Sequence, residues 1–258
     1  AVALLHDVGH GAFSHTLEHE LIEDFSHEDM SRVLLTDLNE RMDGALDLAL
    51  AMFDDTYDRP FFHQLVSSQL DMDRLDYLRR DSFYTGVAEG EVGVQRLLKT
   101  MRVHPLSGGA DAEVMIEAKG IYAVENFLIS RRLMYWQAYL HKTVLAGDEL
   151  LRGILHRAQT HLDAGPAPDW LQRGSRALLF FLDHDVHADA IETPEVRDHY
   201  LQLDDTDILF SLKQWMQGPD PVLADLCHRF VNRVFLRVRF LSERPDEAQI
   251  DAWRADVA

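Results

Sequence analysis

Apolar side chains recur every three to four residues through most of this chain, a spacing typical of helices with one buried face. The segments that show it are residues 16–24, 28–40, 44–53, 61–83, 91–102, 204–217 and 221–235. Between Ile121 and His161 there is no proline, and the glycines are Gly147 and Gly153. We therefore expect one helix or two nearly continuous helices of about forty residues there, in a mainly α protein.

Two segments depart from the helical spacing. The stretch MRVHPLSGGADAEVMIEAKG at 101–120 predicts a small β-hairpin that turns at Ser107, Gly108 and Gly109. Residues 234–241, VFLRVRFL, alternate between apolar and polar side chains and predict a strand.

Local signals predict several helix ends. Ser26 followed by Asp29 has the spacing of a capping pair at a helix start, and Asp204 or Asp205 offers a second start. Gly86 follows a helical run and predicts its end. The apolar residues 1–8 predict a helix that ends just before Gly9.

The chain has 258 residues, 47% of them hydrophobic, which suffices for one large domain or a domain with an appended lobe. The GPAP segment at 165–168 predicts a boundary. We expect a core domain at 1–164 and a C-terminal lobe at 165–258, helical with some β structure. The first residues, AVALL, resemble the middle of a buried helix, so we expect a segment of a longer protein.

Charge and cysteine content limit the partners and the compartment. There are 25 Lys and Arg against 44 Asp and Glu, a formal charge of -19 that repels a nucleic-acid backbone and disfavours such a partner. A cleft with a metal ion and a few arginines is still compatible with a small anionic substrate. Cys227 is the single cysteine, and the sequence has no secretory signal or membrane-length apolar run. We expect a reducing, cytoplasmic setting.

The segment LLHDVGHGAFSHTLE at 4–18 concentrates groups that bind metals and transfer protons. The imidazole of His6 and the carboxylate of Asp7 can share one divalent cation. A His-Asp dipeptide alone is weak support, because the chain has another at His184 and Asp185, which we expect at the surface. A zincin-like alternative, His6-Asp7-x-x-His10, requires an unbroken helix over 6–10, which Gly9 disfavours by about 1 kcal/mol.

A second charged segment lies at 67–86, where acidic and basic residues interrupt an apolar helical stripe. One interpretation is an exposed acidic face on which Arg80 pairs with Asp76 one turn earlier. The other is a site to which Asp73 contributes a carboxylate. The helical pattern alone favours the first interpretation.

Four motifs in order decide between these interpretations: HDVGHGAFSHTLE, SHED at 26–29, DMDRLDYLRRD at 71–81 and RRLMYWQAYLHK at 131–142. Together they resemble the HD-domain phosphohydrolases, and in particular the deoxynucleoside-triphosphate triphosphohydrolases and their bacterial relatives. The resemblance implies an HD-domain helical bundle that uses a divalent metal to convert a dNTP to a deoxynucleoside and triphosphate. It also implies a homo-oligomer, a dimer or tetramer.

The resemblance assigns roles to the residues that match the motifs. The implied metal ligands are His6, Asp7 and Asp73, for Mg²⁺, Mn²⁺, Fe²⁺, Ni²⁺ or Zn²⁺; the family's first histidine ligand, on a preceding helix, has no counterpart in this sequence. The implied catalytic residues are His10, His15, Glu18 and His27, with His15 and Glu18 as a proton-donating dyad. The simpler interpretation of His15 or His27 is a helix cap or a hydrogen-bonded core histidine.

The implied substrate contacts are Arg74, Arg131 and Lys142 for phosphate, Tyr77 and Asp81 for the sugar and its 3′ hydroxyl, and Tyr139 for the deoxyribose. We expect Trp136 to pack in the core. Two other functions stay open: a nucleotide phosphomonoesterase or phosphodiesterase with the same His-Asp metal core, and a module that senses nucleotides without hydrolysing them.

Overall fold

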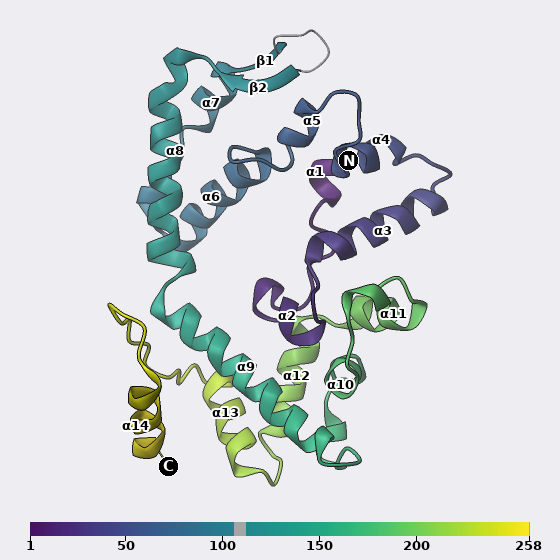
Figure 1. Cartoon of the computed structure of the whole chain (residues 1–258), viewed down its shortest axis with the longest axis vertical. Coiled ribbons are helices and arrows are strands. Elements are labelled where there is room, and N and C mark those ends of the chain that lie inside the picture. The colour runs from purple at the N-terminus through teal and green to yellow at the C-terminus, as the bar shows by residue number, and fades with distance from the viewer. Residues whose placement is uncertain (106–111, 258) are drawn as a thin grey trace.

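The structure, a computed structural model, describes residues 1–105 and 112–257 and is mainly helical, as expected (Figure 1). Its α-helices are α1 (Val2–Leu5), α2 (Glu18–Leu21), α3 (His27–Arg41), α4 (Asp47–Phe53), α5 (Phe61–Gln64), α6 (Met72–Thr85), α7 (Val94–Thr100), α8 (Ile121–Met134), α9 (Lys142–Asp163), α10 (Arg176–Asp183), α11 (Pro194–Gln202), α12 (Asp205–Trp215), α13 (Pro221–Val231) and α14 (Glu247–Val257). No helix in the described ranges is both long and apolar enough to cross a bilayer.

A two-stranded antiparallel sheet confirms the predicted hairpin. Strand β1 (Met101–Pro105) pairs with β2 (Ala112–Ile116), and Met101 lies opposite Ile116. The expected turn at Ser107, Gly108 and Gly109 lies outside the described residues.

Helix α8 runs from the hairpin along one side of the molecule, and α9 continues diagonally to the C-terminal helices (Figure 1). After Met134 the backbone continues through a wider π-helical turn, Tyr135–Tyr139, and His141 then caps α9 by accepting a hydrogen bond from the Thr143 N–H. The prediction of two nearly continuous helices is therefore confirmed. The turn between them brings the end of α8 close to α6, where site residues lie.

Three hydrophobic clusters hold the helices together. The largest joins α2 and α3 to α9 and to α10–α13, and Trp215 is its largest fully buried side chain. A second is built from α6, α7 and α8 around Leu78 and Phe127, and a third packs α1 and α4 against Leu35 of α3. The domain boundary expected at 165–168 stays a prediction. The largest cluster contains residues from both sides of this segment, so the two parts share one hydrophobic core.

The predicted helix ends agree with the structure. Ser26 and Asp29 form a reciprocal capping box at the start of α3, and Asp204 does the same with Asp207 at the start of α12. Gly86 ends α6 with φ 74°, a left-handed conformation that glycine adopts without strain.

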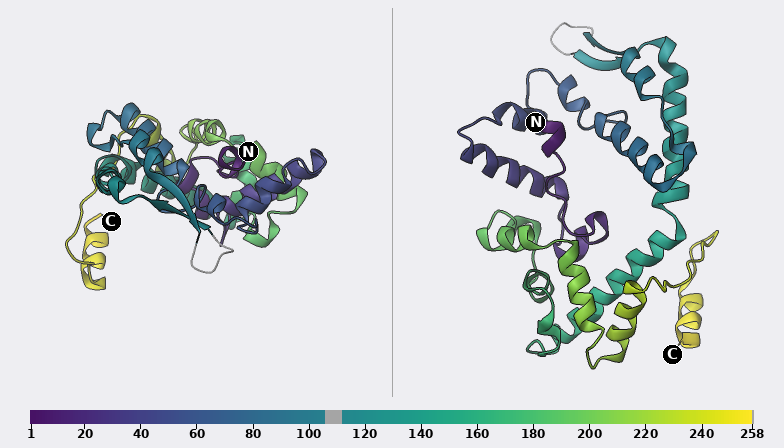
Figure 2. Two further views of the ribbon diagram at one scale, coloured as in Figure 1. Left: turned by 90° about the horizontal axis from the view of Figure 1, so that it is seen from above. Right: turned by 180° about the vertical axis from the view of Figure 1, so that it is seen from behind.

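Several element predictions were wrong. Residues 234–241 form no strand, because the alternating pattern has no neighbouring strand to pair with in the described chain. The helix expected over 61–83 is divided into α5 and α6, since Asp71 caps α6 with a hydrogen bond from the Arg74 N–H. The helix expected over 1–8 ends at Leu5, and the one over 16–24 contracts to α2, preceded by a short 3-10 turn. Residues 165–257 thus contain helices and no strand, and Figure 2 shows α14 away from the other helices.

Candidate active site

His6, Asp7 and Asp73 come together although Asp73 lies 66 residues after Asp7 in the sequence. One donor atom from each lies within 4.8 Å of the others. His6 Nε2 is 3.4 Å from Asp7 Oδ1 and 3.9 Å from Asp73 Oδ1. His6 and Asp7 are in the turn that follows α1, and Asp73 is in the first turn of α6.

The chemistry of these donors fits a divalent cation. His6 Nδ1 lies 3.2 Å from the Ala3 carbonyl oxygen; because a carbonyl only accepts, this nitrogen carries the proton and Nε2 is free to bind a metal. Burial, and then the nearby charge of Asp7, raise the pKa of Asp73. Carboxylates that repel each other in a half-buried site are stabilised by a shared cation.

The zincin-like alternative is wrong. Residues 6–9 form turns after α1, so His6 and His10 do not lie on one helix. His10 Nε2 instead approaches the second carboxylate oxygen of Asp7, at 3.9 Å.

Close packing explains the glycines of the HDVGHG segment. A Cβ atom at Gly9 would lie 2.3 Å from the His27 carbonyl oxygen and 2.3 Å from the Ser31 nitrogen, so only glycine fits. The Gly9 N–H donates to Ser31 Oγ at 2.9 Å. This approach of the loop to the start of α3 places Asp7 beside His27, whose Nε2 is 3.9 Å from Asp7 Oδ1.

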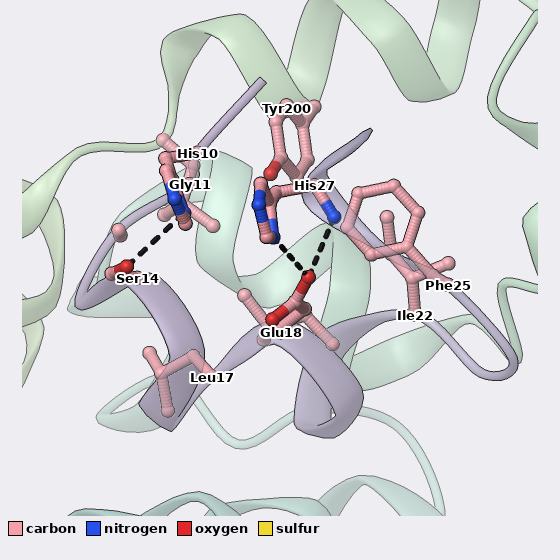
Figure 3. A pocket seen from close by; sticks show the side chains of 12 residues that line it. His10, Gly11, Ser14, Leu17, Glu18, Ile22, Phe25, His27 and Tyr200 are labelled. Atoms are coloured by element: carbon pink, nitrogen blue, oxygen red, sulfur yellow. Dashed lines mark hydrogen bonds and ion pairs between the residues drawn. The ribbon is translucent and has the colours of Figure 1, made fainter. Parts of the chain in front are cut away.

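Three histidines, His10, His15 and His27, lie together next to the candidate metal ligands. His10 and His27 also line a small cavity of about 10 Å³ whose other walls are largely apolar (Figure 3). The rings of His10 and His27 stack with centroids 3.8 Å apart, and His15 lies edge-on to both, at 4.9 and 5.1 Å. Donor atoms of the three also lie within 4.8 Å of one another. Ser14 Oγ is 3.1 Å from His10 Nδ1.

Glu18 connects His15 and His27. His15 Nδ1 is 2.9 Å from Glu18 Oε2, and His27 Nδ1 is 2.7 Å from Oε1, which also accepts the His27 backbone N–H at 2.6 Å. Since an ionised carboxylate only accepts, both Nδ1 atoms carry protons. The Nε2 atoms of His15 and His27 are left for other partners.

The charges of this cluster are tuned by burial and by these contacts. Burial alone would raise the pKa of Glu18, but the hydrogen bonds from His15 and His27 outweigh it and lower the pKa to about 2. Burial, and then the neighbouring charge of His27, lower the pKa of His10. Glu18 is therefore an anion at neutral pH, while His10 favours its neutral form.

The expected substrate residues of α6 and of the π-helical turn after α8 also form a group. Tyr139 donates a hydrogen bond of 2.7 Å to Asp81 Oδ2, and its ring centroid lies 6.2 Å from that of Tyr77. Burial, then this hydrogen bond, raise the pKa of Tyr139, so the phenol keeps its proton. Burial, and then Tyr135, raise the pKa of Tyr77.

The arginines of this group are fixed by polar contacts. Arg74 donates from Nε to the Ser68 carbonyl oxygen at 2.8 Å, and it pairs with Asp71 at 3.0 Å. Arg131 donates to Gln69 Oε1 at 3.2 Å.

Four other expectations from the sequence concern Lys142, Trp136, the Arg80–Asp76 pair and the His184-Asp185 dipeptide. The Lys142 ammonium nitrogen lies 5.3 Å from the centroid of the Phe240 ring. Trp136 is 61% exposed, so the expectation that it packs in the core was wrong: the π-helical turn carries it outward. Arg80 pairs with Asp76 at 2.8 Å on an exposed face, which confirms that interpretation for these two residues. His184 and Asp185 are exposed, as expected.

Two residues that support the site were not predicted from sequence patterns. The Tyr200 hydroxyl donates to the Gly9 carbonyl oxygen at 2.7 Å, and Ser31 accepts from the Gly9 N–H. Both contacts depend on how distant segments pack, so no local spacing indicates them. Asp71 lies in one of the four motifs but was assigned no role, although its position at the start of a helical run was the signal for a cap.

The fold and the site together define an α-helical protein with a His-Asp group of candidate metal ligands, and known proteins resemble the chain in sequence and in fold. A solved phosphohydrolase from Bacteroides thetaiotaomicron superposes with a TM-score of 0.89 and 44% identity, over 99% of this chain and 61% of that one. An uncharacterized protein of Bacillus subtilis, YwfO, is 35% identical over 249 residues, 93% of this chain and 53% of the relative.

A deoxynucleoside triphosphate triphosphohydrolase SAMHD1 homolog of Dictyostelium discoideum is 28% identical over 156 residues, 54% of this chain and 29% of that protein. No family model matches the chain. These similarities support an HD-domain phosphohydrolase family for the chain. It spans about half the length of the Bacillus relative.

Proposed function

We propose that the protein is a metal-dependent phosphohydrolase that converts dNTPs to deoxynucleosides and triphosphate. One observation carries the proposal: Asp7 belongs to the group of candidate metal ligands and also lies 3.9 Å from both His10 Nε2 and His27 Nε2. Asp7 is thus shared between the candidate metal ligands and the candidate proton-transfer residues. Hydrolysis of a phosphate ester requires an activated water and a proton for the leaving oxygen, which these two groups could supply.

His6, Asp7 and Asp73 would hold the cation, which supplies Lewis-acid activation of water and of phosphate oxygens. His15 is suited to donate a proton to the 5′ oxygen of the leaving deoxynucleoside. Its Nδ1 is bonded to the Glu18 carboxylate, which stabilises the charged ring, and its side chain is 70% exposed, so a proton on Nε2 is accessible. Glu18 also holds His27 in place.

The second residue group supports a deoxynucleotide as substrate. The guanidinium groups of Arg74 and Arg131 suit phosphate oxygens. Asp81 and Tyr139 offer a carboxylate for a sugar hydroxyl and an aromatic face beside C2′, where a 2′ hydroxyl would collide. The activity named for the Dictyostelium relative is consistent with this choice. Lys142 as a further phosphate contact, and the homo-oligomer, stay predictions.

The test is to incubate the whole protein with each dNTP and Mn²⁺ or Mg²⁺, and to separate the products by chromatography. We expect deoxynucleoside and triphosphate. Asp73→Ala should lose the activity, and His15→Ala should lower kcat at least about 100-fold. Asp76→Ala changes an exposed carboxylate of the same helix and serves as the matched control.

Other product patterns would replace the proposal. Release of phosphate from nucleoside monophosphates with no deoxynucleoside formed from dNTPs would indicate a phosphomonoesterase. Thermal stabilisation by dNTPs without any product would indicate a nucleotide sensor.

A further inference from the structure

A second group of metal-binding side chains lies outside the candidate active site. It consists of Glu23, which follows α2, and of Asp185 and His187, in the segment between α10 and α11. One donor atom from each residue lies within 4.8 Å of the others. The LDHDVHADA segment thus contributes Asp185 and His187 to this group, whereas it has no role in the activity proposed above.

The backbone fixes the two segments against each other. The Glu23 N–H donates to the Val186 carbonyl oxygen at 2.9 Å, and the Ala188 N–H donates to the Glu23 carbonyl oxygen at 3.0 Å. These bonds form an isolated parallel bridge between Glu23 and His187. The flanking side chains of Ile22 and Val186 are buried in the largest core cluster. The Cα positions of Glu23 and His187 are therefore set by the fold, while their side chains face solvent.

We propose that Glu23, Asp185 and His187 bind one divalent transition-metal ion of the Zn²⁺ class. Ligand atoms about 2.0–2.1 Å from a tetrahedral Zn²⁺ are about 3.3 Å apart, and Glu23 Oε2 lies 3.3 Å from His187 Nδ1. Asp185 Oδ2 lies 3.6 Å from Nε2, the other nitrogen of the His187 ring, so the exposed Asp185 side chain has to rotate toward Nδ1 to complete the set. An imidazole with two carboxylates suits Zn²⁺ and its neighbours in the transition series better than Ca²⁺ or Mg²⁺.

The surroundings favour a cation. Asp24, Asp189 and Glu192 line an adjoining groove of about 620 Å³, and their negative potential raises the local cation concentration. The imidazole distinguishes the proposed site from this acidic surface, because it selects a transition metal. With three protein ligands, remaining coordination positions are open to water.

A bound ion would join the end of α2 to the segment before α11. Helix α2 begins at Glu18, which holds His15 and His27. An ion that binds only the folded chain stabilises it, and at 100 times its dissociation constant it raises the folded-to-unfolded ratio about 100-fold. The site would thus be structural, securing the segment that presents Glu18.

The test measures Zn²⁺ binding to the whole protein carrying Asp73→Ala, which weakens the candidate active-site metal group. Equilibrium dialysis should show one Zn²⁺ fewer per chain, or affinity at least about tenfold weaker, when His187→Ala is added. Zn²⁺ should raise Tm less in that variant than in its parent. Adding Asp189→Ala instead removes an exposed carboxylate of the adjoining groove that is outside the proposed ligand group, so it should reduce Zn²⁺ binding and the Tm shift far less than His187→Ala does.

Circular dichroism without metal checks that each variant folds. The side chains of His187 and Asp189 are exposed, and the half-buried Asp73 is replaced in every chain compared, so any effect of that change is common to all of them. Equal Zn²⁺ binding and equal Tm shifts with and without His187→Ala would overturn the proposal. So would an equal loss in the Asp189→Ala chain, since it would indicate diffuse binding to the acidic surface. Neither result would bear on the proposed hydrolysis.

Discussion

Tyr200 donates a hydrogen bond of 2.7 Å to the carbonyl oxygen of Gly9, across 191 residues of sequence. The bond is buried, and it joins α11 to the loop that carries His6, Asp7 and His10. Burial, followed by the charge of Glu18, raises the pKa of Tyr200, so the hydroxyl stays protonated. The C-terminal helices thereby support the geometry of the candidate active site.

Replacing Tyr200 by Phe should destabilise the protein by about 1–2 kcal/mol, because the Gly9 carbonyl oxygen loses its buried donor. Urea denaturation measures the change in the free energy of unfolding. Tyr122→Phe is the matched control, since that side chain is 79% exposed. Equal stability of both variants would mean that the Tyr200 bond contributes nothing.

Gly9→Ala should be strongly destabilising, by more than about 2 kcal/mol, because the new methyl group would lie 2.3 Å from backbone atoms of His27 and Ser31. Gly153→Ala should have the opposite effect. Gly153 lies inside α9, and a methyl group added there would meet no atom within 4 Å apart from the neighbouring backbone of its own helix, so alanine should add about 0.4–1 kcal/mol. Thermal unfolding of the two variants checks the signs, and a tolerated Gly9→Ala would contradict the close approach of the loop to α3.

The Glu18 contacts predict a specific loss of stability in acid. The pKa of Glu18 is lowered from 4.5 to about 2 on folding, so its contribution is complete above pH 4.5 and is lost as the pH falls toward 2. This contribution is on the order of 3 kcal/mol. Between pH 4.5 and 2, the free energy of unfolding of Glu18→Gln should therefore fall less than that of the parent. Denaturant unfolding curves recorded at a series of pH values measure this difference. Glu28→Gln, at an exposed position of α3, should follow the parent. Parallel curves for parent and Glu18→Gln would contradict the role of Glu18.

Cys227 should be unreactive in the folded protein. It is fully buried in the largest core cluster, and burial raises its thiol pKa to about 12. At pH 8 only about one thiol in ten thousand would be ionised, and the thiolate is the reactive form. A colorimetric disulfide reagent should label it only after denaturation, and rapid labelling of the native protein would contradict the packing of α13.

Sequence patterns predicted features that depend on neighbouring residues. The capping boxes at Ser26 and Asp204, the helix end at Gly86 and the hairpin strands all follow from side chains within a few positions. The pattern failed at 234–241, because alternation makes a strand only where another strand is available for pairing. It also failed at Trp136, where a π-helical turn changes which side chains face outward.

For the candidate site, too, the sequence indicates the residues but not the tertiary contacts that bring them together. Its residues were chosen because their motifs resemble a family, and spacing alone could not show that Asp73 approaches His6 and Asp7. The sequence also shows the two glycines of the HDVGHG segment, but the reason for them is tertiary: a Cβ atom at Gly9 would collide with α3, and one at Gly11 would lie 2.7 Å from the Tyr200 hydroxyl of α11. The partnership of Tyr200 with Gly9 is a purely tertiary contact, formed when α11 packs onto the loop.

The central claim is that His6, Asp7 and Asp73 bind one cation together. The metal content of the purified protein, measured by inductively coupled plasma mass spectrometry beside Asp73→Ala and Asp76→Ala, tests it directly. We predict that Asp73→Ala contains one ion fewer per chain than the parent, while Asp76→Ala keeps the parental content. Equal metal content in the parent and in Asp73→Ala would contradict the account.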